Sequence, residues 1–227
     1  MEPNPEDWTP IPLNEEFLAD QANRDDLRKQ AKKDWEQVPE SAASVELSFF
    51  CGNITVSSYL GAVKIAHAFD QVISLGTLED FPDDLFSGHA SRHRLKFDDV
   101  TGASPLETQD GVITPGEECI HAILNMADKN KSTLIHCKAG VSRSPAMAIL
   151  LAWHWQHPLE AILTGLNQKK VYPNQLILSL GEKVLGLAQG CISEPVFERL
   201  RGGANENPAL PIFRMNEHGE FKLFIEG

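Results

Sequence analysis

The sequence predicts an α/β fold with a central, mostly parallel sheet that is flanked by helices on both faces. Two observations lead to this prediction. Short apolar segments typical of buried strands occur at residues 71–75 and 133–136. Segments with apolar residues at helical spacing follow along the chain, among them residues 120–127 and 143–155. Strands that alternate with helices of this length are typical of parallel sheets covered on both sides.

The first predicted strands form a hairpin. Apolar and polar residues alternate in residues 45–49 and again in 54–56, and Gly52-Asn53 between them is typical of a tight turn. Further strands are predicted at residues 71–75, closed by Gly76, at 94–97, at 133–136, and as a hairpin over 212–225.

One helix start carries its own signal. Thr114 is a candidate N-cap, Pro115 suits the first turn, and Glu117 would complete a capping box before the apolar face over 120–127. The other predicted helices cover residues 23–37, 143–155, 159–166 and 176–187, the last of them stopped by Gly190.

The length and composition bound the domain organisation. A chain of 227 residues, of which 42% are hydrophobic, can form one sizeable α/β domain with extensions. Residues 1–43 are polar and charged and predict an N-terminal extension. We expect the main, catalytic domain at residues 44–200 and a C-terminal extension at 201–227.

Charge and cysteine usage exclude several kinds of partner. The formal net charge is −12, so the long-range field repels nucleic acids and anionic membranes, and we expect neither as a partner. The N-terminus is acidic and proline-rich without an apolar run, and the four cysteines form no CxxC pair. We therefore expect a cytoplasmic protein with reduced thiols. Any site for an anionic substrate must build its own local positive field.

The segment that carries chemistry is TLIHCKAGVSRSPAM, residues 133–147. A predicted strand ends at His136, a glycine-containing loop follows, and a helix begins near Arg143. Backbone N–H groups of residues 138–144 in such a turn converge into an anion-binding nest, which the positive end of the helix dipole reinforces. Phosphate is the natural guest of this nest.

The side chains of this segment suggest nucleophilic catalysis. A helix N-terminus and nearby cations favour the reactive thiolate of a cysteine, which makes Cys137 the candidate nucleophile. The planar guanidinium of Arg143 can bind two phosphoryl oxygens at once. Ser144 can donate a hydrogen bond to the sulfur, and His136 is expected to orient the backbone of Cys137. The predicted phosphate-binding residues are Lys138, Ala139, Gly140, Val141 and Ser142.

These residues carry a resemblance to a known family. HCKAGVSRS resembles the HC-x5-R-[ST] loop of the cysteine-dependent protein tyrosine phosphatases, and its AG-x-SRS form is similar to the dual-specificity branch. Residues 72–75 are similar to the family's "hVInL" strand, and residues 172–176 to its "PN-x-x-F" segment, here in a form also found in bacterial members. The resemblance extends from about residue 54 to residue 187. It implies an α/β phosphatase domain that needs no metal and no cofactor.

The resemblance also implies a general acid upstream of the cysteine. The family places an Asp after a strand that ends in L-x-x-x-D, and Leu95 to Asp99 fits this pattern. Asp98 is the close rival, and Asp110 and Glu107 are further candidates. In the implied two-step reaction, a cysteinyl-phosphate forms and is then hydrolysed.

The expected substrate is a phosphoprotein or a small phosphomonoester, with phosphotyrosine and phosphoserine/threonine as the preferred groups. Lys138 directly after the cysteine leaves a phosphoinositide or inositol phosphate as an alternative, because lipid phosphatases of this superfamily often carry lysine there. Val141 lacks the second basic residue of their pattern. A rhodanese- or arsenate-reductase-like use of the loop, or a non-catalytic phosphate-binding regulator, are alternatives of other classes.

Overall fold

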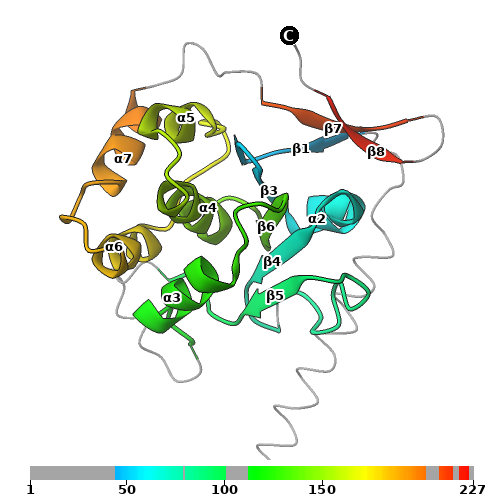
Figure 1. The fold of residues 1–227 in the computed structure, drawn as a ribbon, viewed down its shortest axis with the longest axis horizontal. Coiled ribbons are helices and arrows are strands. Elements are labelled where there is room, and N and C mark those ends of the chain that lie inside the picture. Colours follow the sequence, from blue (N-terminus) through cyan, green and yellow to red (C-terminus); the bar gives the residue numbers. More distant parts are fainter. Residues whose placement is uncertain (1–43, 79, 101–111, 203–209, 217–219, 225–227) are drawn as a thin grey trace, which may run out of the picture.

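The structure is a computed structural model, and it describes residues 44–78, 80–100, 112–202, 210–216 and 220–224. Its central sheet has five strands in the order β2-β3-β6-β4-β5 (Figure 1). Only β2 is antiparallel to its neighbour. The strands are β2 (Phe49–Cys51), β3 (Ile54–Ser58), β6 (Thr133–Cys137), β4 (Gln71–Leu75) and β5 (Arg92–Leu95). The predicted α/β class and mostly parallel sheet are confirmed.

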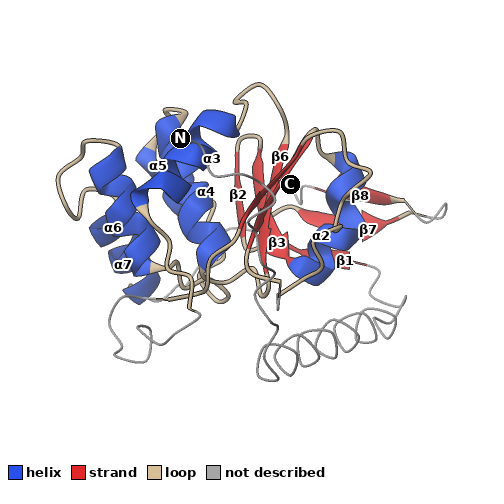
Figure 2. Cartoon of the chain, turned by 90° about the horizontal axis from the view of Figure 1, so that it is seen from below, coloured by secondary structure: helices blue, strands red, loops and turns tan. Residues whose placement is uncertain are grey.

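The larger core lies between one face of this sheet and a layer of helices (Figure 2). Successive side chains of strand β6 point to opposite faces of the sheet, so Ile135 and Cys137 belong to this core whereas Leu134 belongs to the opposite one. The helices of this layer are α3 (Glu117–Met126), α4 (Arg143–His154), α5 (Leu159–Thr164), α6 (Gln175–Val184) and α7 (Ser193–Arg201).

A smaller core covers the other face of the sheet. Helix α2 (Tyr59–Ile65), extended by the 3-10 turn η2 (Ala66–Ala68), shares this face with a second, antiparallel sheet in the order β1-β7-β8 (Figure 2). The strands of that sheet are β1 (Ser44–Glu46), β7 (Ile212–Met215) and β8 (Phe221–Phe224). Phe213 of β7 pairs with Val45 of β1, and both are buried in the smaller core. The predicted C-terminal hairpin is therefore confirmed, and it packs against the sheet domain.

Several strand and helix boundaries differ from those predicted from the sequence. The single strand predicted at residues 45–49 is two strands, β1 and β2, in different sheets, and Asn167 bonds to the backbone of Leu47 and Ser48 at the break. Helix α3 begins at Glu117 after Gly116, without a side-chain cap, so the predicted capping box from Thr114 is wrong. Helix α6 ends at Val184, ahead of the predicted end at residue 187. The helix predicted at residues 23–37 lies outside the described residues.

The parallel strands bring their carboxyl ends to one edge of the sheet. There Ser58 of β3 pairs with Cys137 of β6, and Leu75 of β4 pairs with Leu95 of β5. The segments that follow these strands therefore meet at one place, as expected for ligand sites in open α/β sheets. In the part of the chain that the structure describes, no helix is both long enough and apolar enough to span a bilayer.

Candidate active site

Cys137 lies at the carboxyl end of the central strand β6, with only 1% of its surface exposed. Its sulfur accepts hydrogen bonds from the backbone N–H of Gly140 at 3.3 Å and from the hydroxyl of Ser144 at 3.1 Å. Both donors are placed to stabilise negative charge on the sulfur when the residue acts as a nucleophile or a leaving group. The hydrogen bond predicted from Ser144 to the sulfur is thus present in the structure.

The loop of residues 138–142 is held by its carbonyl groups. The N–H of Tyr59 donates to the carbonyl of Lys138, that of Tyr172 to Val141, and that of Asn174 to Ser142, at 2.9–3.1 Å. Carbonyl groups committed to outside partners favour a loop whose N–H groups converge inward, the arrangement of an anion nest.

Gly140 is the residue that makes this loop geometry possible. Its φ is +72°, a conformation that side chains rarely adopt. A Cβ at this position would lie 2.6 Å from the backbone nitrogen of Ser58. The loop can therefore rest against the end of β3 only with glycine here.

His136 lies beneath the loop, on the opposite face of β6 from Cys137. Its ring is fully buried, and Nε2 shares a hydrogen bond of 2.7 Å with the hydroxyl of Ser74. Burial, assisted by the charges of Arg94 and Arg143, lowers the pKa of His136 to about 3. The ring is therefore neutral and has no access to the nest, which agrees with a supporting role and not with that of a base.

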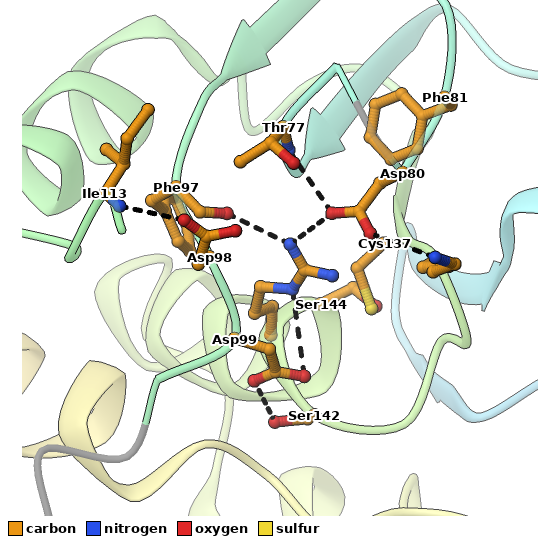
Figure 3. Close-up of polar contacts among 12 residues, drawn as sticks. Thr77, Asp80, Phe81, Phe97, Asp98, Asp99, Ile113, Cys137, Ser142 and Ser144 are labelled. Carbon is orange, nitrogen blue, oxygen red and sulfur yellow. Dashed lines mark hydrogen bonds and ion pairs between the residues drawn. The ribbon is translucent and has the colours of Figure 1, made fainter. Parts of the chain in front are cut away.

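Arg143, the first residue of α4, is also buried, and two partners hold one end of its guanidinium. Its Nη1 donates to Asp80 Oδ2 at 2.6 Å and to the carbonyl of Phe97 at 3.0 Å (Figure 3). A second nitrogen of the guanidinium, Nε, is buried and has no hydrogen-bond partner among the described residues. A buried donor without a hydrogen-bond partner costs free energy, so we expect Nε to donate a hydrogen bond to an oxygen of a bound anion.

Asp80 was not predicted from the sequence. It follows β4, 11% of its side chain is exposed, and it accepts a hydrogen bond from the N–H of Thr77 as well as from Arg143. Gly76 leaves room for this pair, because a Cβ there would lie 2.5 Å from Asp80 Oδ2. Lys138, whose side chain is 64% exposed, places its Nζ 3.8 Å from Asp80 Oδ1.

The two candidate acids, Asp98 and Asp99, point in different directions (Figure 3). Asp99 Oδ1 accepts a hydrogen bond of 2.6 Å from Ser142 of the loop, and its Oδ2 lies 3.8 Å from Arg143 Nε. Asp98 instead accepts a hydrogen bond of 2.8 Å from the N–H of Ile113. The structure thus brings Asp99 to the loop and places Asp98 against the segment that precedes α3. Asp110 and Glu107 lie outside the described residues.

The chain resembles the cysteine-dependent phosphatases. The likeness now includes the position of the cysteine after a central parallel strand, the glycine-containing loop and the arginine that opens the following helix. No family model and no curated protein sequence matches the chain.

Solved structures of phosphatases or phosphatase-like proteins are similar to the chain. The human tyrosine phosphatase-like serine/threonine/tyrosine-interacting protein is 16% identical, covering 59% of this chain and 91% of its own, with a TM-score of 0.39. The core catalytic domain of the PP-IP phosphatase SIW14 from S. cerevisiae is 16% identical, covering 67% and 91%, with a TM-score of 0.38. A leucine-rich repeat and phosphatase domain containing protein from Entamoeba histolytica is 19% identical, covering 63% and 93%, also with a TM-score of 0.38.

Two residues of the site were not predicted from the sequence. They are Asp80 and Asn174. In the sequence, Asp80 follows directly on another acidic residue, Glu79, and nothing in the spacing distinguishes a site residue there from a solvated one. Asn174 had a visible signal, since it precedes a helix and belongs to the quoted family segment, but that signal also describes an ordinary N-cap.

Proposed function

We propose that this chain is a phosphatase that hydrolyses phosphomonoesters, with phosphotyrosine and phosphoserine/threonine in proteins as its substrates. The observation that carries the proposal is the pairing of two features around one loop. The sulfur of Cys137 accepts two hydrogen bonds, from the backbone of Gly140 and from the hydroxyl of Ser144. The Nε of Arg143, which is buried and has no hydrogen-bond partner among the described residues, lies at the start of the helix that follows. A nucleophile and an anion-binding donor placed in this way suit phosphoryl transfer.

In the first step, the Cys137 thiolate attacks phosphorus, and the bond between phosphorus and the leaving oxygen breaks. Asp99, protonated, gives its proton to that oxygen, and a cysteinyl-phosphate remains. In the second step, the Asp99 carboxylate takes a proton from water as the water attacks phosphorus, and the P–S bond breaks. Ser144 stabilises the departing thiolate, and phosphate leaves. The loop N–H groups and Arg143 stabilise the transferring phosphoryl oxygens.

The charges around the loop of residues 138–142 favour a singly phosphorylated group over a polyanion. Lys138 is the one basic side chain of the loop besides Arg143, and Asp80 lies beside it. An inositol phosphate with several phosphates would need more cations than Lys138 and Arg143, because the chain already carries a net charge of −12 that repels a polyanion. The reaction also requires a reduced Cys137, which fits the expected cytoplasmic location.

The test is turnover of para-nitrophenyl phosphate by the wild-type chain and by Cys137→Ser and Arg143→Lys. We expect the wild type to be active in EDTA and inhibited by vanadate, and both variants to lose nearly all activity. Cys137→Ser should still bind vanadate, because the nest is largely backbone. Arg143→Lys fails because an ammonium group cannot replace a bidentate guanidinium. Near-normal turnover by Cys137→Ser would rule out the mechanism.

The substrate class is tested with a panel of phosphopeptides and soluble inositol phosphates on the wild-type enzyme. The proposal expects higher kcat/KM on the phosphopeptides. A reversal of this order would support the inositol phosphate alternative. Binding of phosphopeptides without any turnover would identify the chain as a non-catalytic regulator.

A further inference from the structure

Asn174 links the segment that carries Asp99 to a helix. Its Nδ2 donates to Asp99 Oδ1 at 2.9 Å and to the carbonyl of Val100 at 2.8 Å. Its Oδ1 accepts the N–H of Ile177 at 3.1 Å, which caps the first turn of α6. The residue is only 1% exposed. Both ends of the amide are thus in use, one on the helix and the other on residues 99 and 100.

We propose that Asn174 is a positioning residue that fixes Asp99 with Oδ2 directed at the phosphoryl group. The inference rests on the proposed function, in which Asp99 is the general acid. It assigns Asn174 a role beyond the helix cap that its sequence position indicates.

The hydrogen bonds at Asp99 separate its two oxygens. Oδ1 accepts from both Ser142 Oγ, at 2.6 Å, and Asn174 Nδ2, at 2.9 Å. An oxygen that accepts two hydrogen bonds is a poor place for the proton of the neutral acid, so that proton resides on Oδ2. Oδ2 lies 3.8 Å from the Nε of Arg143, the donor that awaits a phosphoryl oxygen. The proton is therefore held on the side of the carboxyl group where the leaving oxygen will lie.

The position of Asn174 is itself tied to the catalytic loop. Its backbone N–H donates to the carbonyl of Ser142 at 3.1 Å, so loop, acid and helix end form one hydrogen-bonded unit. The charged group that faces Asp99 is Arg143, and Asp80 pairs with the opposite, Nη1 end of that guanidinium. A side-chain substitution at Asn174 keeps this backbone bond to the loop. We therefore expect it to affect proton transfer by Asp99 and to leave the phosphate nest in place.

The experiment uses Asn174→Asp in the full chain. Aspartate keeps an oxygen that can cap α6 but replaces the amide donor with a carboxylate that repels Asp99. Because a misplacement of about 1 Å can cost about 10²-fold, we expect kcat/KM on phenyl phosphate, whose phenolate is a poor leaving group, to fall by about 10- to 100-fold. Turnover of an activated aryl phosphate should change much less. The basic limb of the pH–rate profile should move to higher pH, since a neighbouring negative charge favours the protonated acid.

Two controls separate positioning from folding. Gln175→Ala alters the exposed neighbour on the same helix end and should leave both substrates unaffected. Asn174→Ser, which also retains a capping oxygen, removes the long amide donor without adding charge, and should reproduce the loss on phenyl phosphate if the Asp variant folds poorly. Thermal unfolding and the affinity for vanadate should stay near wild type in Asn174→Ser.

The deciding measurement is the double variant with Asp99→Asn. If Asn174 acts through Asp99, adding Asn174→Ser to Asp99→Asn causes no further loss on phenyl phosphate. The inference is overturned if the two losses multiply, or if Asn174→Ser slows both substrates equally while Asp99→Asn remains selective for the poor leaving group. Failure of the proposed function looks different, because wild-type chain would then lack turnover, or Asp99→Asn would lack any leaving-group selectivity, and the inference would fall with it.

Discussion

The segments that follow β4 and β5 each bring a carboxylate to Arg143, and the two carboxylates differ in nearly every other respect. Asp80, after β4, has 11% of its side chain exposed and bonds directly to Nη1 at 2.6 Å. Asp99, after β5, is 40% exposed and keeps Oδ2 at 3.8 Å from Nε. The first carboxylate hydrogen-bonds directly to the guanidinium, whereas the second keeps an oxygen near a guanidinium nitrogen that has no hydrogen-bond partner among the described residues.

This difference suggests a division of labour between neighbouring strand ends. A buried ion pair fixes the plane of the guanidinium, because Asp80 and the carbonyl of Phe97 both occupy Nη1. An exposed carboxylate near the remaining edge can exchange protons with water and substrate. We therefore expect substitutions at Asp80 to affect how the phosphoryl group is bound and those at Asp99 to affect how the leaving group departs.

The largest effect is expected on the Asp99 side. A positioned general acid contributes about 10²–10⁴-fold, so Asp99→Asn should lower kcat/KM, which reports the first step, by about that factor on phosphotyrosine and phenyl phosphate. The loss should be much smaller on an activated aryl phosphate, whose leaving group needs no proton. The basic limb of the pH–rate profile should disappear as well.

Asp98→Asn is the matched control for this prediction. Asp98 accepts from Ile113 and does not touch Arg143, so its variant should keep the leaving-group dependence and the basic limb. If the two variants exchange behaviours, Asp98 is the acid. If both remain fast on poor leaving groups, the donor lies elsewhere, with Asp110 the next residue to test.

The two sides also differ in how far the sequence could predict them. Cys137, Arg143 and Ser144 lie within eight residues on one strand–loop–helix unit, so local spacing alone predicts their meeting. Asp99 was found because the strand before it has a recognisable pattern. Asp80 and Asn174 meet their partners only through the fold, at sequence separations of 63 from Arg143 and 75 from Asp99, and a local pattern does not predict these contacts. The break between β1 and β2 was missed for the same reason, since Asn167 acts on it from 120 residues away.

A smaller effect is expected on the Asp80 side, with a different signature. Asp80→Asn keeps an oxygen acceptor but removes the charge that fixes Arg143. Because a misplacement of about 1 Å costs up to about 10²-fold, we expect roughly a tenfold loss in kcat. The loss should be equal on good and poor leaving groups, since proton transfer is not involved. Steady-state kinetics on the same aryl phosphate series checks this.

The same variant should respond more strongly to bound anions. Removing one partner of a buried ion pair typically costs about 3–5 kcal/mol, and less where a hydrogen bond is kept. Phosphate or vanadate then supplies the missing negative charge, so each should raise the Tm of Asp80→Asn by more than that of the wild type. An equal rise in Tm, together with selectivity for the leaving group, would show that Asp80 shares the role assigned to Asp99.

The smallest effect concerns stability, and it again separates the buried side from the exposed one. His136 packs against Phe81, next to Asp80, with ring centroids 4.9 Å apart, and its pKa is lowered from 6.5 to about 3. Below pH 6.5 the unfolded chain therefore binds a proton at this residue that the folded chain does not. The stability of the fold must then decrease as the pH falls from 6.5 toward 3, by about 1.4 kcal/mol per pH unit.

His136→Gln removes this titration while keeping a group that can hydrogen-bond to Ser74. Between pH 6.5 and pH 5 the titration amounts to about 2 kcal/mol, or about 4–8 °C in a domain of this size. We expect the Tm of His136→Gln to fall less over this interval than that of the wild type, whereas the Tm of Asp99→Asn should follow the wild type. Thermal unfolding at both pH values measures this difference. Parallel curves for wild type and His136→Gln would mean that the ring is protonated in the folded protein, and that the buried side of Arg143 carries one more positive charge than the structure indicates.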